Sequence, residues 1–525
     1  MATASIAQPL EKQGLDSRRH LLFVGITFAS LVYLLGLIYY AQMRPVDGDE
    51  GYYVSAARLV WEGKIPYRDF AYPQAPLLPY IYSWIWAVHP RSLLAMRFFS
   101  CACGAIAVFL WGVCLVSARK LPLRVALATF AIVLLNPYWV SWNVVVKTFA
   151  VANLLTTIAV ICLYLALQTG RARWFFTAAL ALGTCACVRG LYLLLPAAVF
   201  LWLFHLEWRA KERSFPKSLA FLGGAACGMS PMVFSFLGDP HAFVFNNVQY
   251  HHLLFSHVTL RNTLHMYLIL AVNLFYPFRS LAARYFTVET VLAVVGGLSL
   301  LKLRKSQAAP YSSKDYLFFQ LTFLMLLVYL ATIGMSLIPP PDQYFNSPLL
   351  PFLVPFMAEG LRVAFRSSAK WVVALAIMLP IFSFYEISAG AKAWAGYPWA
   401  PLSSYRRVTQ VIEANSKADD VVLSLWPGYV FESGRRYFPG AEDHFNYAVA
   451  RKIDPEARSR YHVIFNDEIM SAVASRSVQL LVTDPNIWHF KVFLSPAERA
   501  AFRTTVDANY ELVATIDGVE VYRRR

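Results

Sequence analysis

Apolar runs long enough to cross a bilayer recur along the chain and are separated by short polar gaps. The first run follows a polar stretch and extends from 21 to about 41. A transmembrane helix needs about 20 predominantly apolar residues. Further apolar runs lie at about 93–118, 123–140, 148–168, 174–189, 191–206, 218–237, 285–302, 315–338, 348–366 and 371–388. The pattern predicts eleven spans, with a tight turn at Arg189-Gly190 dividing the 174–206 stretch.

The first apolar run is expected to be an uncleaved span rather than a signal peptide. It is longer than the apolar core of a signal peptide, and no small-residue cleavage site precedes Met43. Basic residues stand just before it, at Arg18 and Arg19. Because cytoplasmic flanks of membrane helices are enriched in Lys and Arg, the N-terminus is predicted to be cytoplasmic.

The gaps between the predicted spans alternate in charge. The basic gaps contain Arg119, Lys120 and Arg124; Arg171 and Arg173; Arg209, Lys211, Arg213 and Lys217; Lys302, Arg304, Lys305 and Lys314; and Arg362, Arg366 and Lys370. The positive-inside rule places these gaps in the cytoplasm. An odd number of spans then places the C-terminus on the extracytoplasmic side of the plasma (inner) membrane.

Composition supports a polytopic α-helical membrane protein. Hydrophobic residues make up 58% of the 525 residues, charged residues 15%, and the mean hydropathy is +0.47. A soluble chain carries about 25% charged residues, so a cytosolic enzyme and a disordered protein are excluded. All seven Cys lie in or beside apolar runs, which favours packing roles over disulfides or metal ligation.

The net charge of +16 belongs almost entirely to the membrane part. Residues 391–525 contain 17 Lys and Arg against 16 Asp and Glu, a net charge of +1, which leaves +15 for residues 1–390. The excess charge therefore follows the cytoplasmic gaps, and no nucleic-acid partner is predicted.

The last 135 residues change character and predict a soluble extracytoplasmic α/β domain. Val421–Leu425 and Leu480–Thr483 have the pattern of buried strands, and Tyr510–Ile516 and Val519–Arg523 flank the hairpin turn Asp517-Gly518. Ser495-Pro496-Ala497-Glu498 is a capping box, and helical patterns cover about 403–415 and 466–476. The predicted domains are thus 1–390, with outer loops 42–92, 136–147, 238–285 and 339–347, and 391–525.

Polar side chains on the predicted outer face concentrate in the first loop. Three carboxylates, Asp47, Asp49 and Glu50, stand within four residues directly after the first span. A carboxylate near a low-dielectric region has a raised pKa, which suits a general base. The alternative is a solvated acidic loop. The loop continues into Gly51–Gly63, whose apolar spacing predicts a short helix along the membrane surface.

The first outer loop resembles that of the GT-C glycosyltransferases, and within them the protein O-mannosyltransferases and the aminoarabinose transferase of lipid A. The resemblance rests on Asp49-Glu50-Gly51-Tyr52-Tyr53, Ala56-Ala57-Arg58-Leu59, Gly63-Lys64-Ile65-Pro66-Tyr67-Arg68-Asp69-Phe70 and the Pro73–Pro79 segment. It is strongest over about 20–170, and collinear to about 390.

The resemblance implies a membrane glycosyltransferase that takes a sugar from a polyprenyl-phosphate-linked donor and passes it, with inversion, to a hydroxyl of a lipid, glycan or protein on the extracytoplasmic face. It implies Asp49 as general base, with Glu50 as second candidate. Tyr52 and Tyr53 would line the sugar site. Arg58 and Arg68 would contact phosphate, or pair locally with Glu62 and Asp69.

Two departures from the family pattern stand out. The next outer loop, Asn136–Lys147, has no acidic residue and offers Asn143 and Lys147 instead. Pro73-Gln74 replaces an acidic-Lys pair common among relatives, which makes Gln74 a candidate contact. A phosphate-binding cation is then expected at Lys147 or Arg189. The alternative for Lys147 is that its side chain snorkels to the membrane surface, and the alternative for Arg189 is that it caps a helix turn.

The second long outer loop carries five His, and the closest three are His251, His252 and His257. Their spacing matches no standard metal site, so no metal site is predicted and no cofactor is required, although a divalent ion is left open. His251 and His252 are expected to face the donor phosphate or the acceptor, and Tyr344 in the short third loop is expected to close the cavity.

Two other functions compete with sugar transfer. A transporter or flippase of lipid-linked sugars predicts inverted repeats and ionisable residues at the midplane. The sequence shows no such repeat, and its ionisable residues gather at the outer ends of spans. The third hypothesis is a non-catalytic envelope assembly subunit. It stays open because the loop Asn136–Lys147 lacks the second acidic residue that many relatives carry.

Overall fold

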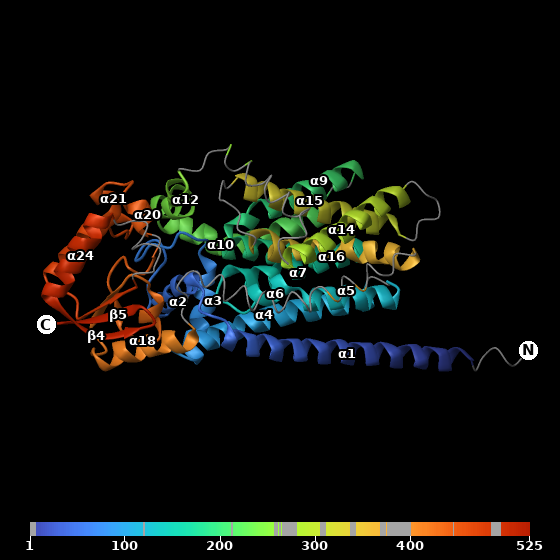
Figure 1. Cartoon of the computed structure of the whole chain (residues 1–525). Coiled ribbons are helices and arrows are strands. Elements are labelled where there is room, and N and C mark those ends of the chain that lie inside the picture. The colour runs from blue at the N-terminus through green and yellow to red at the C-terminus, as the bar shows by residue number, and fades with distance from the viewer. Residues whose placement is uncertain are drawn as a thin grey trace, which may run out of the picture.

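The fold is described from a computed structural model over residues 7–118, 121–211, 214–256, 281–304, 311–335, 343–367, 401–444, 446–484 and 495–525, with the single residues Arg261, Leu264, Ala374 and Met378. A bundle of roughly parallel helices ends in a smaller domain built around a sheet (Figure 1). The N-terminus and this C-terminal domain lie at opposite ends of the bundle (Figure 1).

The N-terminal half of the bundle contains α1 (Ala7–Met43), α2 (Gly48–Trp61), α3 (Leu77–Val88), α4 (Leu93–Val113), α5 (Leu123–Leu135), α6 (Pro137–Trp142), α7 (Thr148–Thr169) and α8 (Ala172–Val188). The remainder contains α9 (Leu194–Arg209), α10 (Pro216–Gly238), α11 (Pro240–Val244), α12 (Tyr250–Leu254), α14 (Leu281–Leu303), α15 (Ser313–Met335) and α16 (Gln343–Arg366).

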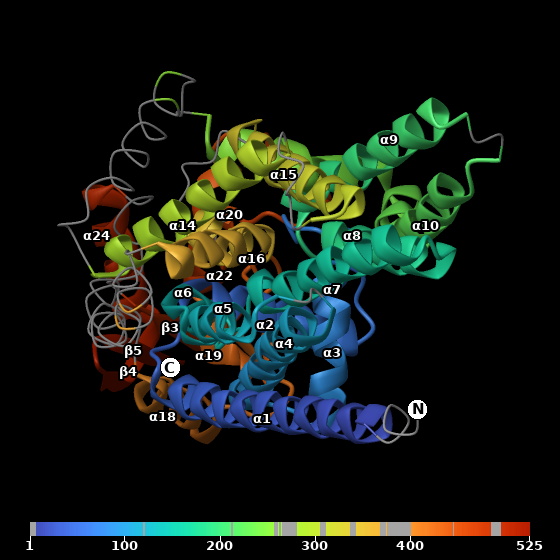
Figure 2. The ribbon, with the colours of Figure 1, turned by 90° about the vertical axis from the view of Figure 1, so that its right-hand side faces the viewer.

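Helix α1 runs along the edge of the bundle (Figure 2). Leu21, Phe28 and Leu35 follow one another at seven-residue spacing and are more than 60% exposed, whereas Tyr33 and Leu37 on the opposite side are buried. Large apolar side chains exposed in this way are unfavourable in water and typical of a lipid-facing surface. The first predicted span is therefore a helix that presents one face to lipid.

Seven helices among the described residues are long and apolar enough to cross a membrane. They are His20–Met43, Leu93–Ser117, Thr148–Thr169, Gly190–Arg209, Pro216–Gly238, Ser313–Gly334 and Ser347–Arg366. The predicted turn at Arg189-Gly190 is present, since α8 ends at Val188 and a short 3₁₀ turn, Gly190–Tyr192, leads into α9. The predicted helical, multi-pass architecture is confirmed, while the number of eleven spans stays a prediction.

Three of the expected spans need comment. The run at 123–140 is not one helix: α5 ends at Leu135, and α6 begins at Pro137 because Asn136 caps it through a bond from the Trp139 amide. The run at 285–302 lies within α14. The run at 371–388 lies outside the described residues apart from Ala374 and Met378.

Helices α14 and α16 cross at a contact between glycines. A Cβ atom on Gly296 would lie 2.0 Å from the Phe356 carbonyl oxygen, and one on Gly360 would lie 2.0 Å from the Leu292 carbonyl oxygen. Small residues at such a crossing allow two backbones to approach closely. Any side chain at either position must push the helices apart.

Replacing Gly296 with Ala is therefore expected to destabilise the protein by about 1–3 kcal/mol through overpacking. The matched control is Gly297→Ala on the same helix, because no heavy atom lies within 4 Å of the Cβ that it adds. Thermal unfolding in lipid nanodiscs measures both variants. Equal midpoints for the two would contradict the close crossing.

The C-terminal domain contains a five-stranded sheet in the order β2-β1-β3-β5-β4. Strands β1 (Val421–Ser424), β2 (Arg436–Tyr437) and β3 (Leu480–Thr483) are parallel, and β4 (Tyr510–Ile516) and β5 (Val519–Arg524) form an antiparallel hairpin beside them. The helices are α18 (Leu402–Ala414), α19 (Gly428–Phe431), α20 (Asn446–Ala450), α21 (Pro455–Arg460), α22 (Asn466–Ala474) and α24 (Pro496–Asn509).

The predicted elements of this domain are present. Asp517 and Gly518 both have positive φ, 47° and 89°, which is the geometry of a type I′ hairpin turn. The capping box of Ser495 and Glu498 starts α24. The short strand β2 and the helices α19 to α21 were not predicted, because segments of two to six residues carry too little periodicity. The predicted fold class, a helical membrane protein with a C-terminal α/β domain, is confirmed.

Candidate active site

The acidic motif opens helix α2, where the bundle meets the C-terminal domain (Figure 1). Asp47 is the N-cap and accepts a hydrogen bond from the Asp49 amide at 3.1 Å, while its own amide donates to Glu50 Oε2 at 2.8 Å. A capping box of this kind satisfies amides at a helix start that would otherwise lack partners. The same residues that form the predicted site thus also begin the helix.

Glu50 is held on all sides by hydrogen bonds. Its carboxylate makes a two-point ion pair with Arg97 of α4, at 2.5 and 2.8 Å, and both side chains are fully buried. The Val146 amide donates to Oε1 at 2.9 Å and the Asp47 amide to Oε2. Because a carboxylate has about four lone-pair positions, Glu50 has no site left for an acceptor hydroxyl. This geometry favours a structural role for Glu50 over its role as the second candidate for the general base.

Arg97 also fastens the end of α1. Its guanidinium donates to the carbonyl oxygens of Ala41, Arg44 and Pro45 at 2.6, 2.9 and 3.1 Å. These carbonyls belong to the last turn of α1 and the residues that follow it, where helical partners are missing. Arg97 and Glu50 together fix the position at which the chain leaves the first span.

Lys147 forms ion pairs with the other two carboxylates of the motif, Asp47 and Asp49. It stands directly before α7, and its Nζ lies 2.7 Å from Asp47 Oδ1 and 2.9 Å from Asp49 Oδ2. The Lys147 side chain is 6% exposed, Asp47 19% and Asp49 36%. The Trp142 ring lies 5.0 Å from Lys147 Nζ and 5.0 Å from the Arg44 guanidinium carbon. Lys147 therefore serves the acidic cluster and does not snorkel.

The pKa values of the two carboxylates bound by Lys147 are shifted in opposite directions. Burial acts on Asp47, but Lys147 and Arg44 outweigh it and hold the pKa of that carboxyl below its usual range. Burial and the charge of Asp47 outweigh Lys147 at Asp49 and raise the pKa of that carboxyl. Asp49 is thus the most exposed carboxylate of the motif, and its pKa is raised where that of Asp47 is lowered. Access to an acceptor and a raised pKa are the properties a general base needs.

Tyrosine side chains form a wall beside the motif. Tyr52 stacks on Tyr72 with ring centroids 5.1 Å apart, and it contacts Tyr53 edge to face at 5.0 Å. Tyr52 and Tyr53 are 4% and 8% exposed. The backbone of Tyr72 donates to Asn246 Oδ1 at 2.9 Å, which ties the first outer loop to the second. The predicted sugar-lining pair therefore belongs to a packed aromatic cluster.

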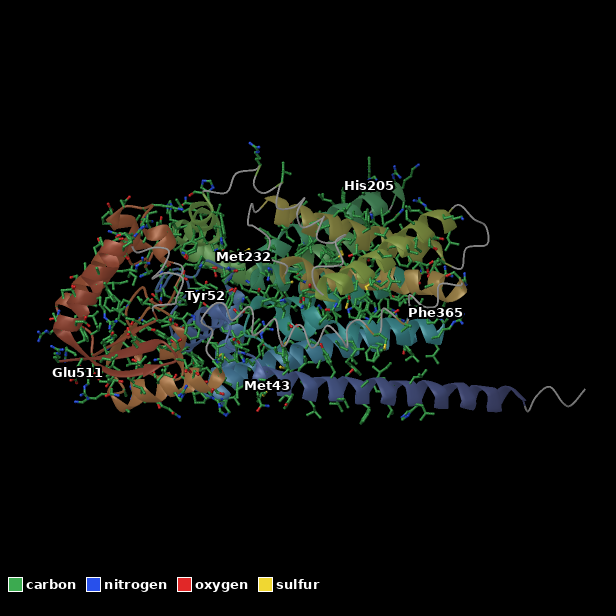
Figure 3. All side chains as sticks on the ribbon, in the orientation of Figure 1. Met43, Tyr52, His205, Met232, Phe365 and Glu511 are labelled. Atoms are coloured by element: carbon green, nitrogen blue, oxygen red, sulfur yellow. The ribbon has the colours of Figure 1, made fainter. Side chains whose placement is uncertain are left out.

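Helix α2 is buried between the bundle and the C-terminal domain. Trp426 Nε1 donates to the Gly48 carbonyl at 2.8 Å, and a Cβ on Gly51 would lie 2.6 Å from the Trp426 ring. Figure 3 places Tyr52 where the two parts of the chain meet. The helix predicted at Gly51–Gly63 is present as part of α2, and 11 of the 14 residues of α2 are buried. Its position along the membrane surface stays a prediction.

The two predicted arginine sites are occupied by local partners. Arg58 pairs with Glu62 at 2.7 Å and donates to the carbonyls of Val430 and Gly434 at 3.4 and 3.2 Å, so it holds the C-terminal domain against α2. Arg68 makes an exposed ion pair with Asp69 at 3.0 Å. Both arginines therefore make the local ion pairs that were the alternative to phosphate contacts.

The remaining predicted residues are spread around the motif. Gln74 is half-buried, and its carbonyl accepts the Tyr67 hydroxyl at 2.6 Å. Arg189 is buried, donates to Thr148 Oγ1 at 2.8 Å and stands 4.3 Å from the Phe149 ring centre. His251 contacts the Pro73 backbone, and burial lowers its pKa, whereas His252 is exposed. Tyr344 lies in the first turn of α16, and its side chain lies outside the described residues.

A metal site is not evident in the part of the chain that the structure describes, where no three His, Cys, Asp or Glu side chains form a group able to hold an ion. His257 and His265 lie outside the described residues.

Sequence reasoning missed several residues that the structure brings to the motif. Arg97 was overlooked, although an arginine inside an apolar span is itself a signal of a buried role. Asp443 and His444 of the C-terminal domain are buried; Asp443 accepts the Tyr250 hydroxyl at 3.0 Å, and His444 interacts electrostatically with Asp47 and Lys147. Their separation of nearly 400 residues from Asp47 leaves no local signal.

The loop Asn136–Lys147, which has no acidic residue of its own, contacts a carboxylate from another helix. Glu289 of α14 is buried and accepts a hydrogen bond from Asn136 Nδ2 at 2.6 Å. A carboxylate of another helix therefore contacts the first residue of this loop.

The comparisons with known proteins agree with this architecture. The family described as dolichyl-phosphate-mannose-protein mannosyltransferase matches residues 73–235, which is less than half of the chain. The solved structure of ArnT from Cupriavidus metallidurans bound to undecaprenyl phosphate superposes with a TM-score of 0.60 at 13% identity, covering 96% of this chain and 98% of that one. The chain has the GT-C fold.

Two further structures share this GT-C fold. The apo state of the same ArnT has a TM-score of 0.59 at 11% identity, with 97% of this chain and 98% of that one covered. An Archaeoglobus fulgidus oligosaccharyltransferase, in complex with Zn and sulfate, has a TM-score of 0.53 at 12% identity over 94% of this chain and 73% of that one. No curated protein matches the sequence. The GT-C resemblance inferred from the first outer loop is confirmed, and the membrane glycosyltransferases are the class it points to.

Proposed function

We propose that this GT-C protein transfers a sugar from a polyprenyl-phosphate-linked donor to an acceptor hydroxyl on the extracytoplasmic face of the plasma membrane. The observation that carries the proposal is the position of Asp49. Asp49 is partly exposed, its pKa is raised, and it lies beside the buried Lys147 where the bundle meets the C-terminal domain.

The chemistry follows from these positions. Asp49 takes the proton of the acceptor hydroxyl, the freed oxygen attacks the anomeric carbon, and the bond between that carbon and the phosphate oxygen breaks. The electron pair leaves with the polyprenyl phosphate, which gains one negative charge. A single displacement inverts the anomeric carbon. Because charge develops on the departing phosphate, cations nearby lower the barrier.

Lys147, Arg44 and Arg189 are the cations proposed for this task. Lys147 and Arg44 each lie 5.0 Å from the centre of the Trp142 ring. Arg189, directly after α8, donates to Thr148, the residue after Lys147. The bound undecaprenyl phosphate of the ArnT structure supports a lipid-phosphate donor. The proposed acceptor is a lipid, glycan or protein, and the proposed topology has a cytoplasmic N-terminus and an extracytoplasmic C-terminal domain.

Donor turnover tests the proposal. The full chain in lipid nanodiscs is incubated with undecaprenyl-phosphate-linked mannose, glucose, galactose and arabinose, with an envelope extract as the source of acceptor. Release of undecaprenyl phosphate from one donor is the expected result. Movement of these lipids across proteoliposomes without release would instead support a flippase, and binding without release a non-catalytic subunit.

A further inference from the structure

Two aromatic rings lie among three positively charged side chains beside the acidic motif. Trp142 ends α6 and Phe149 is the second residue of α7; their ring centroids are 5.2 Å apart, and both side chains are buried. The Arg44 guanidinium carbon and Lys147 Nζ each lie 5.0 Å from the centre of the Trp142 ring. The Arg189 guanidinium carbon lies 4.3 Å from the centre of the Phe149 ring. Each of these three cations is therefore within cation–π distance of one of the two rings.

The three cations come from separate segments of the chain. Arg44 follows α1, Lys147 directly precedes α7, and Arg189 directly follows α8. Like charges repel one another, most strongly where water is scarce, so other groups must hold them there. The face of an aromatic ring attracts a cation through its quadrupole but carries no net charge. A ring can therefore fix the position of a cation without neutralising it, whereas a carboxylate cannot.

We propose that Trp142 and Phe149 are positioning residues of the candidate active site: their rings hold the three cations in place, with their charge still available, for the phosphate of the lipid-linked donor. The inference rests on the proposed function for the identity of that phosphate. Both rings act through the cations, and neither is assigned a contact with the donor itself.

Each cation is also held by a second group, of a different kind from the ring. Arg189 donates to the hydroxyl of the residue before Phe149 at 2.8 Å. Arg44 donates to the carbonyl oxygen of the residue before Trp142. Lys147 is paired with the two aspartates of the motif at 2.7 and 2.9 Å. A cation fixed by both a ring and a directional bond keeps little freedom, so its position is set before any ligand binds.

Removing a ring is expected to weaken the binding of a phosphate-bearing lipid. Replacing Trp142 or Phe149 with Leu keeps an apolar side chain and removes the π face. Each variant is expected to bind undecaprenyl phosphate about 5- to 30-fold more weakly, the range expected for loss of a desolvated cation–π contact. Undecaprenol has the same tail without the phosphate, and its affinity is expected to stay unchanged. Native mass spectrometry of the full chain in detergent micelles, titrated with each lipid, measures both affinities.

Two further variants make the comparison specific. Trp142→Phe keeps an aromatic face at the same place and is expected to restore most of the affinity for undecaprenyl phosphate. The matched control is Trp86→Leu on α3, which removes a cation–π contact with Arg58, 5.7 Å from the ring centre, outside the three cations. Its ratio of the two affinities should equal that of the unaltered protein. Leu variants of Trp142 and Phe149 that weaken both lipids equally, or neither, would overturn the proposal, because rings that only fill space do not distinguish a phosphate.

Fluorinated tryptophan at position 142 decides the question even where the Leu variants fold poorly. Fluorine atoms withdraw π electrons and weaken the attraction of the ring for a cation, while the shape of the ring changes little. Affinity for undecaprenyl phosphate is expected to fall with each added fluorine, and affinity for undecaprenol to stay constant. A flat series would contradict the role of the ring. Failure of the proposed function is distinguishable, because it would appear as an absence of donor turnover while phosphate-selective binding still depends on the rings.

Discussion

Replacing Asp49 with Asn is expected to lower the turnover of the lipid-linked donor by about 10²- to 10⁴-fold, the usual contribution of a general base. The substitution keeps the shape of the side chain and removes its ability to take a proton. The amide can still accept from Lys147, so the fold is expected to persist. Initial rates of undecaprenyl phosphate release with saturating donor measure the effect.

The matched control for this variant is Asp69→Asn in the same outer loop. Asp69 pairs with the exposed Arg68 and lies outside the Lys147 cluster, so its loss should leave turnover within about twofold, as expected for an exposed ion pair. If Asp49→Asn turned over normally while Asp47→Asn did not, the base would be the neighbouring carboxylate.

The pH dependence of turnover carries the same information. Only the ionised form of Asp49 can take a proton, and burial raises the pKa of that carboxyl. The rate is therefore expected to fall as the pH is lowered through a value above the ordinary range of aspartate. A profile of kcat/KM against pH that stays flat down to the ordinary aspartate range would contradict this assignment.

Replacing Glu50 with Gln is expected to cost about 3–5 kcal/mol of stability, the typical penalty for leaving one partner of a buried ion pair without its counter-charge. Arg97 would keep its charge in a site where both side chains are fully buried. The carboxylate also receives the Asp47 and Val146 amides, which would meet an NH₂ group on one side. Thermal unfolding in nanodiscs measures the loss.

A matched ion pair on the surface provides the control for Glu50. Glu511 pairs with Arg523 on the β4–β5 hairpin, with both side chains 45% exposed. Glu511→Gln is expected to cost less than about 1 kcal/mol. If Glu50 were instead the base, Glu50→Gln would unfold like the unaltered protein and lose turnover, which is the opposite pattern.

Much of the fold could be predicted from the sequence because its signals are local. The apolar runs, the turn at Arg189-Gly190 and the hairpin at Asp517-Gly518 each depend on a few neighbouring residues. The break at Asn136-Pro137 escaped prediction because apolar residues continue through it, although Pro at the first position of a helix is a known start signal.

The candidate site could be predicted only in part from the sequence. The spacing of Asp47, Asp49 and Glu50 revealed an acidic motif, but nothing in that spacing separates a capping residue, a buried ion-pair partner and an exposed carboxylate. The partners Arg97, in α4, and Lys147, directly before α7, distinguish the three carboxylates, and both lie far from the motif in the sequence. Exposure and partnership are tertiary properties, so the three carboxylates could be assigned different roles only once the helices were placed.

The hydrogen bond between Trp426 and Gly48 can form only late in the synthesis of the chain. The two residues are 378 positions apart, whereas Glu50 and Arg97 are separated by 47. At about 5–20 residues per second of synthesis, the ribosome finishes the Trp426 segment roughly 20–75 s after Gly48. A growing chain can thus complete the Glu50–Arg97 pair early, but Gly48 has no Trp426 partner until the segment around Trp426 emerges. A partly synthesised chain already in the bilayer would hold an open and incomplete site.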